Sequence, residues 1–353
     1  MSSTFDKYFN VVASSLTILG FFIALSVLPN EYKYIGYYTS AGLGLIAVFA
    51  LGLYFGKRAS KLHPADFTEK HFVDNLLIYF AMKKESNANE EIIRLGIALS
   101  TPLWLSHHYL TRKQIGTYVY EAAIDTADTN AQIKVLIDDL GWTNVELGLY
   151  EEAEAKLRLG IKLAEEAKNE YYLSKGYRHL FGINYRNGDL EKAEQYLKLA
   201  VEYADKLPPD KKKDELIAEI HFAKSSLEYK KHNLDISLRE IEAATEQYKN
   251  IPDREWTIKI AARRGDILLE RNEIEEAMTV FRHGLHEAKK YHLNKQMVAN
   301  MIGVSKCQYI RGDYEDAWKT SQAAYVIADG IGMFWEKHLI NIEIEKVRSK
   351  IRH

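Results

Sequence analysis

The sequence contains very little cysteine, proline and glycine. Its 353 residues include one cysteine, Cys307, with six prolines and 20 glycines. A single cysteine excludes an internal disulfide and fits a reducing compartment. Long stretches instead carry Ala, Leu, Glu, Lys and Tyr at helical spacing, and 47% hydrophobic with 27% charged residues is typical of an ordered protein. The net charge of −2 gives no indication of a nucleic-acid partner, and we expect none.

The motifs of common enzymes are also missing. The sequence has no glycine-rich phosphate loop, no CxxC pair and no nucleophile elbow. His283 and His286 have a spacing that can ligate a metal, but no acidic or cysteine cluster accompanies them, which favours exposed helix histidines. We therefore predict no enzymatic activity, no cofactor and no metal.

Two uncharged runs stand near the start of the chain. Residues 9–28 and 35–56 contain no charge, and at about 1.5 Å per residue each could cross a hydrocarbon core of roughly 30 Å. The alternatives are a cleaved signal peptide and a buried hairpin of a soluble protein. No small-x-small cleavage site precedes Pro29, and the second run follows at once. The pattern predicts a transmembrane hairpin over residues 1–61.

The flanking cations predict an orientation for this hairpin. Lys7 precedes the first run and Lys57, Arg58 and Lys61 follow the second, whereas the connecting loop holds only Lys33. Under the positive-inside rule both termini lie in the cytosol. We expect a two-span protein of a bacterial inner or plasma membrane, with the lipid bilayer as one of its partners.

Small residues recur along the second run. They are Gly36, Ser40, Gly44, Gly52 and Gly56. Small side chains let helices approach closely in lipid. The stripe is explained by packing of the two spans against each other, or by homo-oligomerisation through the hairpin.

A six-residue pattern recurs about every 40 residues in the remainder of the chain. It occupies 148–153, 188–193, 232–237, 272–277 and 312–317. The first residue is Gly or Asn in all but His232, as a left-handed turn at a helix end requires. Asp189 and Asp313 follow as candidate N-caps. The last residue is Ala, or Ser in the case of Ser237, and allows close contact between two helices.

This pattern resembles the tetratricopeptide repeat, in the longer form found in kinesin light chains and bacterial peptide-pheromone receptors, over about 130–335. The resemblance implies an all-α fold with a solenoid of five repeats at 130–333. Residues 62–129 are expected to form a membrane-proximal helical region with a degenerate repeat. Residues 334–353 are expected to form a C-terminal capping helix.

The resemblance also implies a concave groove lined by the first helix of each repeat. The residues placed there are Trp142, Lys175, Arg178, Tyr185, Arg186, Tyr229, Lys230, Lys259, Arg263, Lys306 and Tyr309. Tyrosines mixed with Arg and Lys suit a protein, a peptide or an anionic small ligand. The alternative is that the tyrosines pack between helices and the cations face water. The family's carboxylate clamp is not reproduced. Lys259 and Arg263 match its second half, but Phe222 and Ser226 stand where Lys and Asn are expected.

Two functional hypotheses follow from this organisation. The first is a membrane-anchored adaptor that recruits a cytosolic protein or peptide. The second is a sensor-effector, in which binding to the solenoid triggers assembly of the hairpin and disruption of the membrane. That layout is similar to the layout of some bacterial antiviral effectors.

Overall fold

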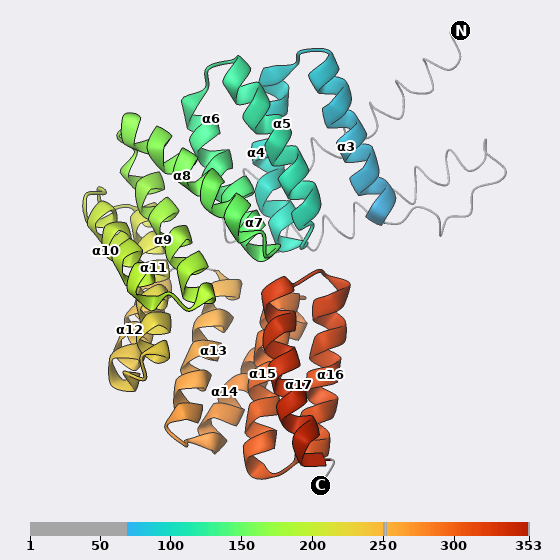
Figure 1. The fold of residues 1–353 in the computed structure, drawn as a ribbon, viewed down its shortest axis with the longest axis vertical. Helices are drawn as coiled ribbons and strands as arrows, with labels where there is room; N and C mark the ends of the chain where they lie inside the picture. The colour runs from blue at the N-terminus through green and yellow to red at the C-terminus, as the bar shows by residue number, and fades with distance from the viewer. Residues whose placement is uncertain (1–68, 250, 252, 352–353) are drawn as a thin grey trace, which may run out of the picture. The chain divides into compact units, whose positions relative to one another are not determined.

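The computed structural model describes residues 69–351 except 250 and 252, and within this range the chain is helical throughout, without strands (Figure 1). The helices are α3 (Glu69–Glu85), α4 (Asn89–Leu105), α5 (Tyr109–Asp125), α6 (Thr129–Lys134), the π-helix η2 (Val135–Trp142), α7 (Thr143–Glu146), α8 (Tyr150–Glu166), α9 (Glu170–Asn187), α10 (Leu190–Asp205), α11 (Lys211–Lys230), α12 (Leu234–Tyr248), α13 (Arg254–Glu270), α14 (Ile274–Lys290), α15 (Asn294–Arg311), α16 (Tyr314–Gly330) and α17 (Phe334–Ile351).

The membrane location predicted from the sequence has to be corrected. None of the helices in the described part of the chain is both long and apolar enough to cross a bilayer. The runs 9–28 and 35–56 on which the prediction rested lie outside the described residues. The same is true of the proposed packing residues Gly36, Ser40, Gly44, Gly52 and Gly56. We therefore withdraw the membrane location and the bilayer as a partner.

The helices form two compact units. The first comprises residues up to 102 together with 110–131, and the second comprises 103–109 together with 132–353. In the first unit α4 and α5 approach closely at Gly96, where a Cβ atom would lie only 2.1 Å from a methyl carbon of Val119. Arg112 is buried there and donates hydrogen bonds of 3.0 Å to the carbonyl and the hydroxyl of Ser100.

The second unit is built from successive helical pairs. Helix α9 packs on α10, α11 on α12, α13 on α14 and α15 on α16, while α17 packs on α16 and α15 (Figure 1). Short turns join the helices of each pair, which therefore run in opposite directions. The apolar faces of neighbouring pairs form clusters such as Leu157, Leu180 and Ile183.

The turns within these pairs confirm the prediction from the repeated pattern. Their first residues all have left-handed backbone, with φ of 75° at Gly148, 83° at Gly188, 59° at His232, 63° at Asn272 and 89° at Gly312. His232 therefore adopts the same conformation as the glycines. The conformation also recurs at other helix ends, at Asn87, His107, Ala127, Lys168 and His292.

The small residues that end the pattern lie where two helices touch. Ala153, Ala193, Ala277 and Ala317 are fully buried. Ser237 is also buried, and its hydroxyl donates to the carbonyl of Ser225 at 2.9 Å, which explains how a polar residue is accommodated.

One of the two predicted N-caps is present. The Asp189 carboxylate accepts a hydrogen bond of 3.1 Å from the Lys192 amide. The prediction for Asp313 is wrong, because its side chain makes no capping bond at the start of α16.

Candidate functional site

The second unit contains a cavity of about 280 Å³. Its lining side chains come from α9, α11, α13, α15 and α17, with Trp142 and Glu146 added from η2 and α7. None comes from α8, α10, α12, α14 or α16, the second helices of the pairs. The cavity therefore lies on the side of the helical stack that the first helices form, and we call it the pocket.

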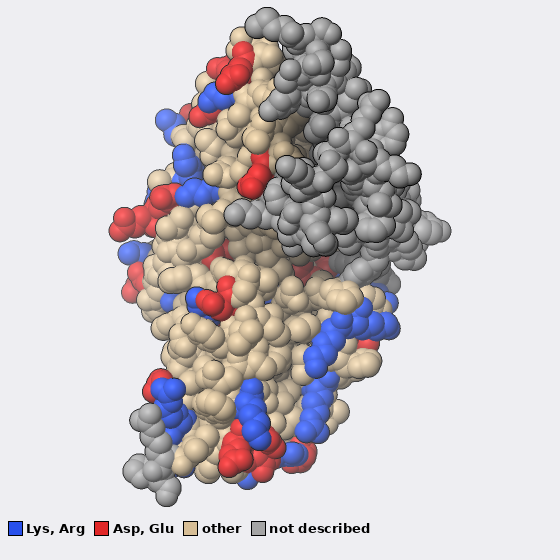
Figure 2. All heavy atoms as spheres, turned by 90° about the vertical axis from the view of Figure 1, so that its right-hand side faces the viewer, with Lys and Arg blue, Asp and Glu red and all other residues tan. Residues whose placement is uncertain are grey.

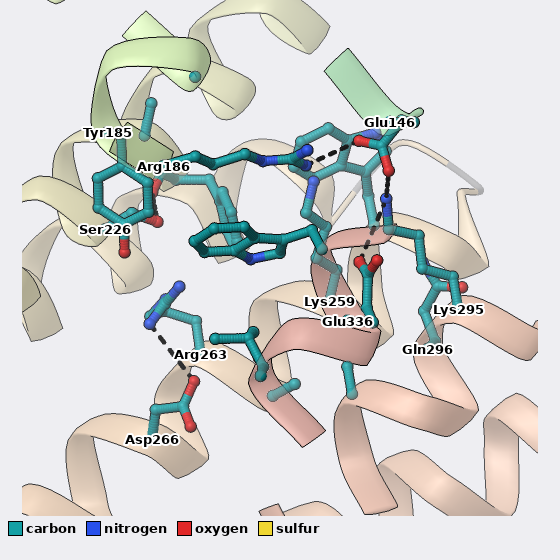
Figure 3. Close-up of a pocket in the computed structure, with 18 of the residues that line it drawn as sticks. Glu146, Tyr185, Arg186, Ser226, Lys259, Arg263, Asp266, Lys295, Gln296 and Glu336 are labelled. Atoms are coloured by element: carbon teal, nitrogen blue, oxygen red, sulfur yellow. Dashed lines mark hydrogen bonds and ion pairs between the residues drawn. The ribbon is translucent and has the colours of Figure 1, made fainter. Parts of the chain in front are cut away.

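Several residues that the sequence predicted for a groove meet in this pocket (Figure 3). They are Trp142, Arg178, Tyr185, Arg186, Lys259, Arg263 and Lys306. They come from η2, α9, α13 and α15, so the fold brings together side chains that are far apart in the sequence. Tyr185, Arg186, Lys259 and Arg263 are labelled in Figure 3.

Aromatic rings form much of the pocket wall. The Trp142 ring stacks on His179, with centroids 4.6 Å apart. The Arg186 guanidinium lies between two indoles, 5.4 Å from the Trp142 centroid and 5.5 Å from the Trp335 centroid. Such contacts hold a guanidinium in place and leave the pocket with flat apolar surfaces.

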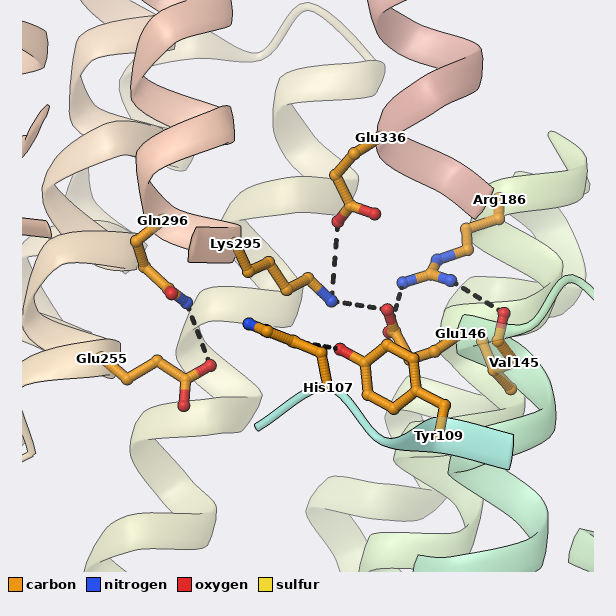
Figure 4. A network of polar contacts seen from close by, with 9 residues as sticks. All are labelled: His107, Tyr109, Val145, Glu146, Arg186, Glu255, Lys295, Gln296 and Glu336. Carbon is orange, nitrogen blue, oxygen red and sulfur yellow. Dashed lines mark hydrogen bonds and ion pairs between the residues drawn. The ribbon is translucent and has the colours of Figure 1, made fainter. Parts of the chain in front are cut away.

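A network of charges crosses one end of the pocket (Figure 4). The buried Glu146 carboxylate accepts from Arg186 at 2.8 Å and from Lys295 at 2.5 Å. Lys295 also lies 3.5 Å from the Glu336 carboxylate. Burial alone would raise the pKa of Glu146, but the charges of Arg186 and Lys295 outweigh it and lower that pKa. Glu146 is therefore ionised at neutral pH.

His107 and Tyr109 adjoin this network. The His107 Nδ1 and the Tyr109 hydroxyl are 3.0 Å apart (Figure 4). Burial, followed by the charge of Lys295, lowers the pKa of His107 to about 4. His107 is therefore neutral at physiological pH and adds no cation to the site.

Most remaining cations of the pocket are also paired. Arg178 lies 2.7 Å from the Glu219 carboxylate. Arg263 and Lys306 share Asp266, at 3.4 Å and 3.5 Å. These pairs fix the side chains of α9, α13 and α15 around the cavity and leave their charges largely compensated.

Lys259 differs from the other cations of the pocket. Among the described residues it forms no ion pair, and its ammonium lies 3.8 Å from the Trp256 centroid and 4.7 Å from the Phe222 centroid. Burial and then the charge of Lys295 lower the pKa of Lys259 to about 8. Its charge is thus only partly compensated within the chain.

Four predicted groove residues do not line the pocket. Lys175 pairs with Asp138 at 2.7 Å, and the Tyr229 hydroxyl donates to Glu270 at 3.1 Å. Lys230 lies over the Tyr185 ring, and Tyr309 is covered by the ammonium of Lys346 at 4.5 Å. These four side chains are engaged in contacts within the fold, and Lys175 is ion-paired instead of facing water.

Several pocket residues were not predicted from the sequence. They are Glu146, Glu219, Trp256, Lys295, Trp335 and Glu336. A signal existed for Lys295 and Trp335, which follow Glu255, the neighbour of the pocket residue Trp256, at intervals of about one repeat. The prediction was limited to the middle and end of each first helix and therefore missed side chains at its start.

The outer surface shows a different charge pattern. On the face seen in Figure 2, Lys and Arg form a short row, and Asp and Glu stand in small groups separated by uncharged surface. Pairs within one helix, such as Arg158 with Glu154, are typical of solvated helix faces.

Comparisons with known proteins give a likeness of fold only. Neither protein-family profiles nor curated proteins match this sequence. Among solved structures, a Rap protein complexed with Competence and Sporulation Factor has a TM-score of 0.52 at 10% identity, covering 88% of this chain and 96% of that one.

Two further solved structures have lower TM-scores. A STAND protein with a tetratricopeptide repeat sensor from Pyrococcus horikoshii has a TM-score of 0.44 at 20% identity, covering 74% of this chain. This chain spans only 45% of the length of that protein. Yeast Tom70 has a TM-score of 0.43 at 16% identity, covering 96% of this chain and 65% of that one. The helical pairs and the Rap likeness together show that this chain has a fold of the tetratricopeptide-repeat type.

Proposed function

We propose that this chain is a protein-interaction module that binds a short segment of a partner protein in the pocket. In this proposal, residues 130–333 form five repeats of the tetratricopeptide type, 62–129 contain a degenerate repeat and 334–353 form a cap. The observation that carries the proposal is the origin of the lining residues, since all those on paired helices come from the first helix of a pair. The likeness to a Rap protein in complex with a factor supports it.

The chemistry of the pocket suits a peptide. Aromatic rings such as Trp142 and Trp256 offer apolar surface to side chains. Ser226 and Gln296 also line the pocket, but they are buried and their donor groups bond to the Phe222 carbonyl and the Glu255 carboxylate. A volume of about 280 Å³ is at the low end for ligand pockets, which suits a few side chains and not a folded domain.

A peptide selection on the full chain tests this proposal. Random peptides displayed on phage would be selected against the protein, and affinities of the selected peptides measured by fluorescence anisotropy. Trp256→Ala removes a pocket ring and is expected to weaken binding by about tenfold or more, as central aromatic contacts do. The matched control is Trp318→Ala, because Trp318 is partly exposed on α16.

The control separates the pocket from a general effect of losing a tryptophan. We expect Trp318→Ala to bind as the unmodified chain does, with both variants keeping their helical circular dichroism. Peptides that bind Trp256→Ala with unchanged affinity would contradict the proposed site.

A further inference from the structure

We infer that Phe334 is a positioning residue for the ligand. By packing on Gly148 it holds the start of α17 against the turn before α8, and this contact keeps the two sides of the pocket together. The inference rests on the proposed function, since it assigns a role in ligand binding to two residues that do not themselves line the pocket. It is carried by the contact, by the residue type at the start of α17 and by the packing on either side.

The contact is one that only a glycine permits. Gly148 has a φ of 75°, and a Cβ atom there would lie 2.6 Å from the Phe334 ring. At three other left-handed glycines of the described chain, a Cβ atom would meet nothing within 4 Å. They are Gly188, Gly312 and Gly332. Gly148 is therefore required both by its backbone conformation and by the ring that lies against it.

The residue type at the start of α17 also differs from that of other first helices. Helix α9 begins with Glu170, α13 with Arg254 and α15 with Asn294, all of them polar. Polar residues are usual at this position, because the first turn of a helix has free N–H groups. Helix α17 begins with Phe334, which also meets the Tyr150 ring edge to face at 6.5 Å between centroids. The contact with the start of α8 explains this exception.

The residues that follow Phe334 show what the contact positions. Trp335 and Glu336 both line the pocket. The Trp335 centroid lies 5.5 Å from the Arg186 guanidinium, and the Glu336 carboxylate lies 3.5 Å from the Lys295 ammonium (Figure 4). Because Phe334, Trp335 and Glu336 belong to one helical turn, a displacement of the first also displaces the other two. A small shift of lining groups is enough to weaken binding.

The two sides of this contact belong to separate apolar clusters. In the described part of the chain, the cluster behind Gly148 contains Leu157, and the cluster behind Phe334 contains Ile340 and Ile344. No residue belongs to both clusters. The contact thus consists of one ring on a glycine and the charged pairs beside it. Charged groups regain water when such a contact separates, so its loss opens the pocket without unfolding either cluster.

A matched pair of glycine substitutions tests the inference on the full chain. Gly148→Ala and Gly188→Ala both place a side chain on left-handed backbone, but only Gly148→Ala displaces the Phe334 ring. The affinity for the selected peptides is measured by fluorescence anisotropy. We expect Gly148→Ala to bind about tenfold more weakly than Gly188→Ala, since a pocket that is closed in a tenth of the molecules binds with a tenth of the affinity.

Substitutions of Phe334 test the same contact without a change of backbone strain. Phe334→Ala is expected to lose about as much affinity as Gly148→Ala, and Phe334→Tyr to bind as the unmodified chain does, because it keeps the ring. The double variant Gly148→Ala/Phe334→Ala should bind little more weakly than Phe334→Ala, since the ring is then no longer there to be displaced.

A distance measurement reports the contact separately from binding. Spin labels are attached to cysteines introduced by Glu151→Cys on α8 and Asn341→Cys on α17, both at exposed positions, in a Cys307→Ser chain. Double electron–electron resonance should give one narrow distance distribution for the unmodified contact and for the glycine control. Both single variants that lose the contact should give a broader distribution at longer distance. A merely structural role would lower stability and leave this distance unchanged.

Several results would overturn the inference. They are equal affinity of Gly148→Ala and Gly188→Ala, full binding by Phe334→Ala, equal losses for Phe334→Ala and Phe334→Tyr, or an unchanged label distance in Phe334→Ala. Selected peptides that need Trp256 but not the contact would refute the role of Phe334 and leave the proposed pocket intact. Peptides that do not need Trp256 would refute the pocket, whatever their dependence on Phe334.

Discussion

Glu146 and Lys295 are 149 residues apart in the chain, yet their side chains form an ion pair of 2.5 Å. Glu146 belongs to the short helix α7 and Lys295 to the first turn of α15. The pair joins an early part of the second unit to a late part, across one end of the pocket (Figure 4). Glu146 and Lys295 both line the pocket. Because they are so far apart in the sequence, they meet only in the folded second unit.

Loss of the Glu146 charge is predicted to destabilise the second unit. Glu146→Gln keeps the shape of the side chain but leaves Arg186 without its ion-pair partner and Lys295 with Glu336 alone, in a buried site. We expect a loss of about 3–5 kcal/mol in the free energy of unfolding, measured by urea denaturation. Glu276→Gln is the control, since its pair with Arg264 is about half exposed, and it should cost less than about 1 kcal/mol. Equal effects of the two substitutions would contradict the importance of the bridge.

The contribution of Glu146 is predicted to depend on pH. Its folded-state pKa is held below the ordinary value of 4.5, so the unfolded chain binds its proton first as the pH falls. The stabilisation is fully present above that ordinary value and is lost as the pH drops toward the folded-state pKa. The difference in unfolding free energy between the unmodified chain and Glu146→Gln should therefore shrink from about pH 6 to about pH 3. A difference that stays constant over this range would show that folding does not lower the pKa of Glu146.

The repeated turns could be predicted because their cause is local. A left-handed residue is needed where each pair of helices turns, and Gly188 and Asn272 supply it at low conformational cost. The bridge between Glu146 and Lys295 could not be predicted, because it depends on the rotation that accumulates from pair to pair.

The turn at Gly188 gives a prediction about backbone conformation alone. Its φ is 83°, and a Cβ atom there would meet no neighbour within 4 Å. Gly188→Val should therefore lose about 1–2 kcal/mol through left-handed strain and not through a clash. Gly188→Asn should lose less, since Asn272 adopts this conformation at φ of 63° in the equivalent turn. Thermal unfolding followed by circular dichroism would rank the two, and a larger loss for Asn would contradict this reasoning.

Close helix contact at Ala193 gives a prediction about packing. The side chain is fully buried between α10 and its neighbours. Ala193→Leu is expected to overpack this contact and cost about 1–3 kcal/mol in urea denaturation. Ala155→Leu is the matched control, because Ala155 is exposed on α8 and its substitution should change stability by less than about 0.5 kcal/mol. Tolerance of leucine at Ala193 would mean that the helices are less tightly packed than described.

A pair of buried serines between α11 and α12 gives a prediction about the energetic coupling of two hydroxyl groups. Ser225 and Ser237 are buried with their hydroxyls 3.0 Å apart. Ser237→Ala should cost about 0.5–1.5 kcal/mol, because it leaves the Ser225 hydroxyl with fewer partners. With Ser225→Ala added, the total loss should be smaller than the sum of the two single losses. Strict additivity in a double-mutant cycle would show that the two hydroxyls act independently.

The most direct test of the proposed function is to map where a selected peptide lies on the full chain. A peptide from the phage selection would carry a photoreactive phenylalanine, and mass spectrometry would identify the residues to which it attaches on irradiation. We predict adducts on the pocket faces of α11, α13 and α15, near Trp256 and Lys259. Adducts confined to α10, α12, α14 or α16, whose side chains do not line the pocket, would contradict the account.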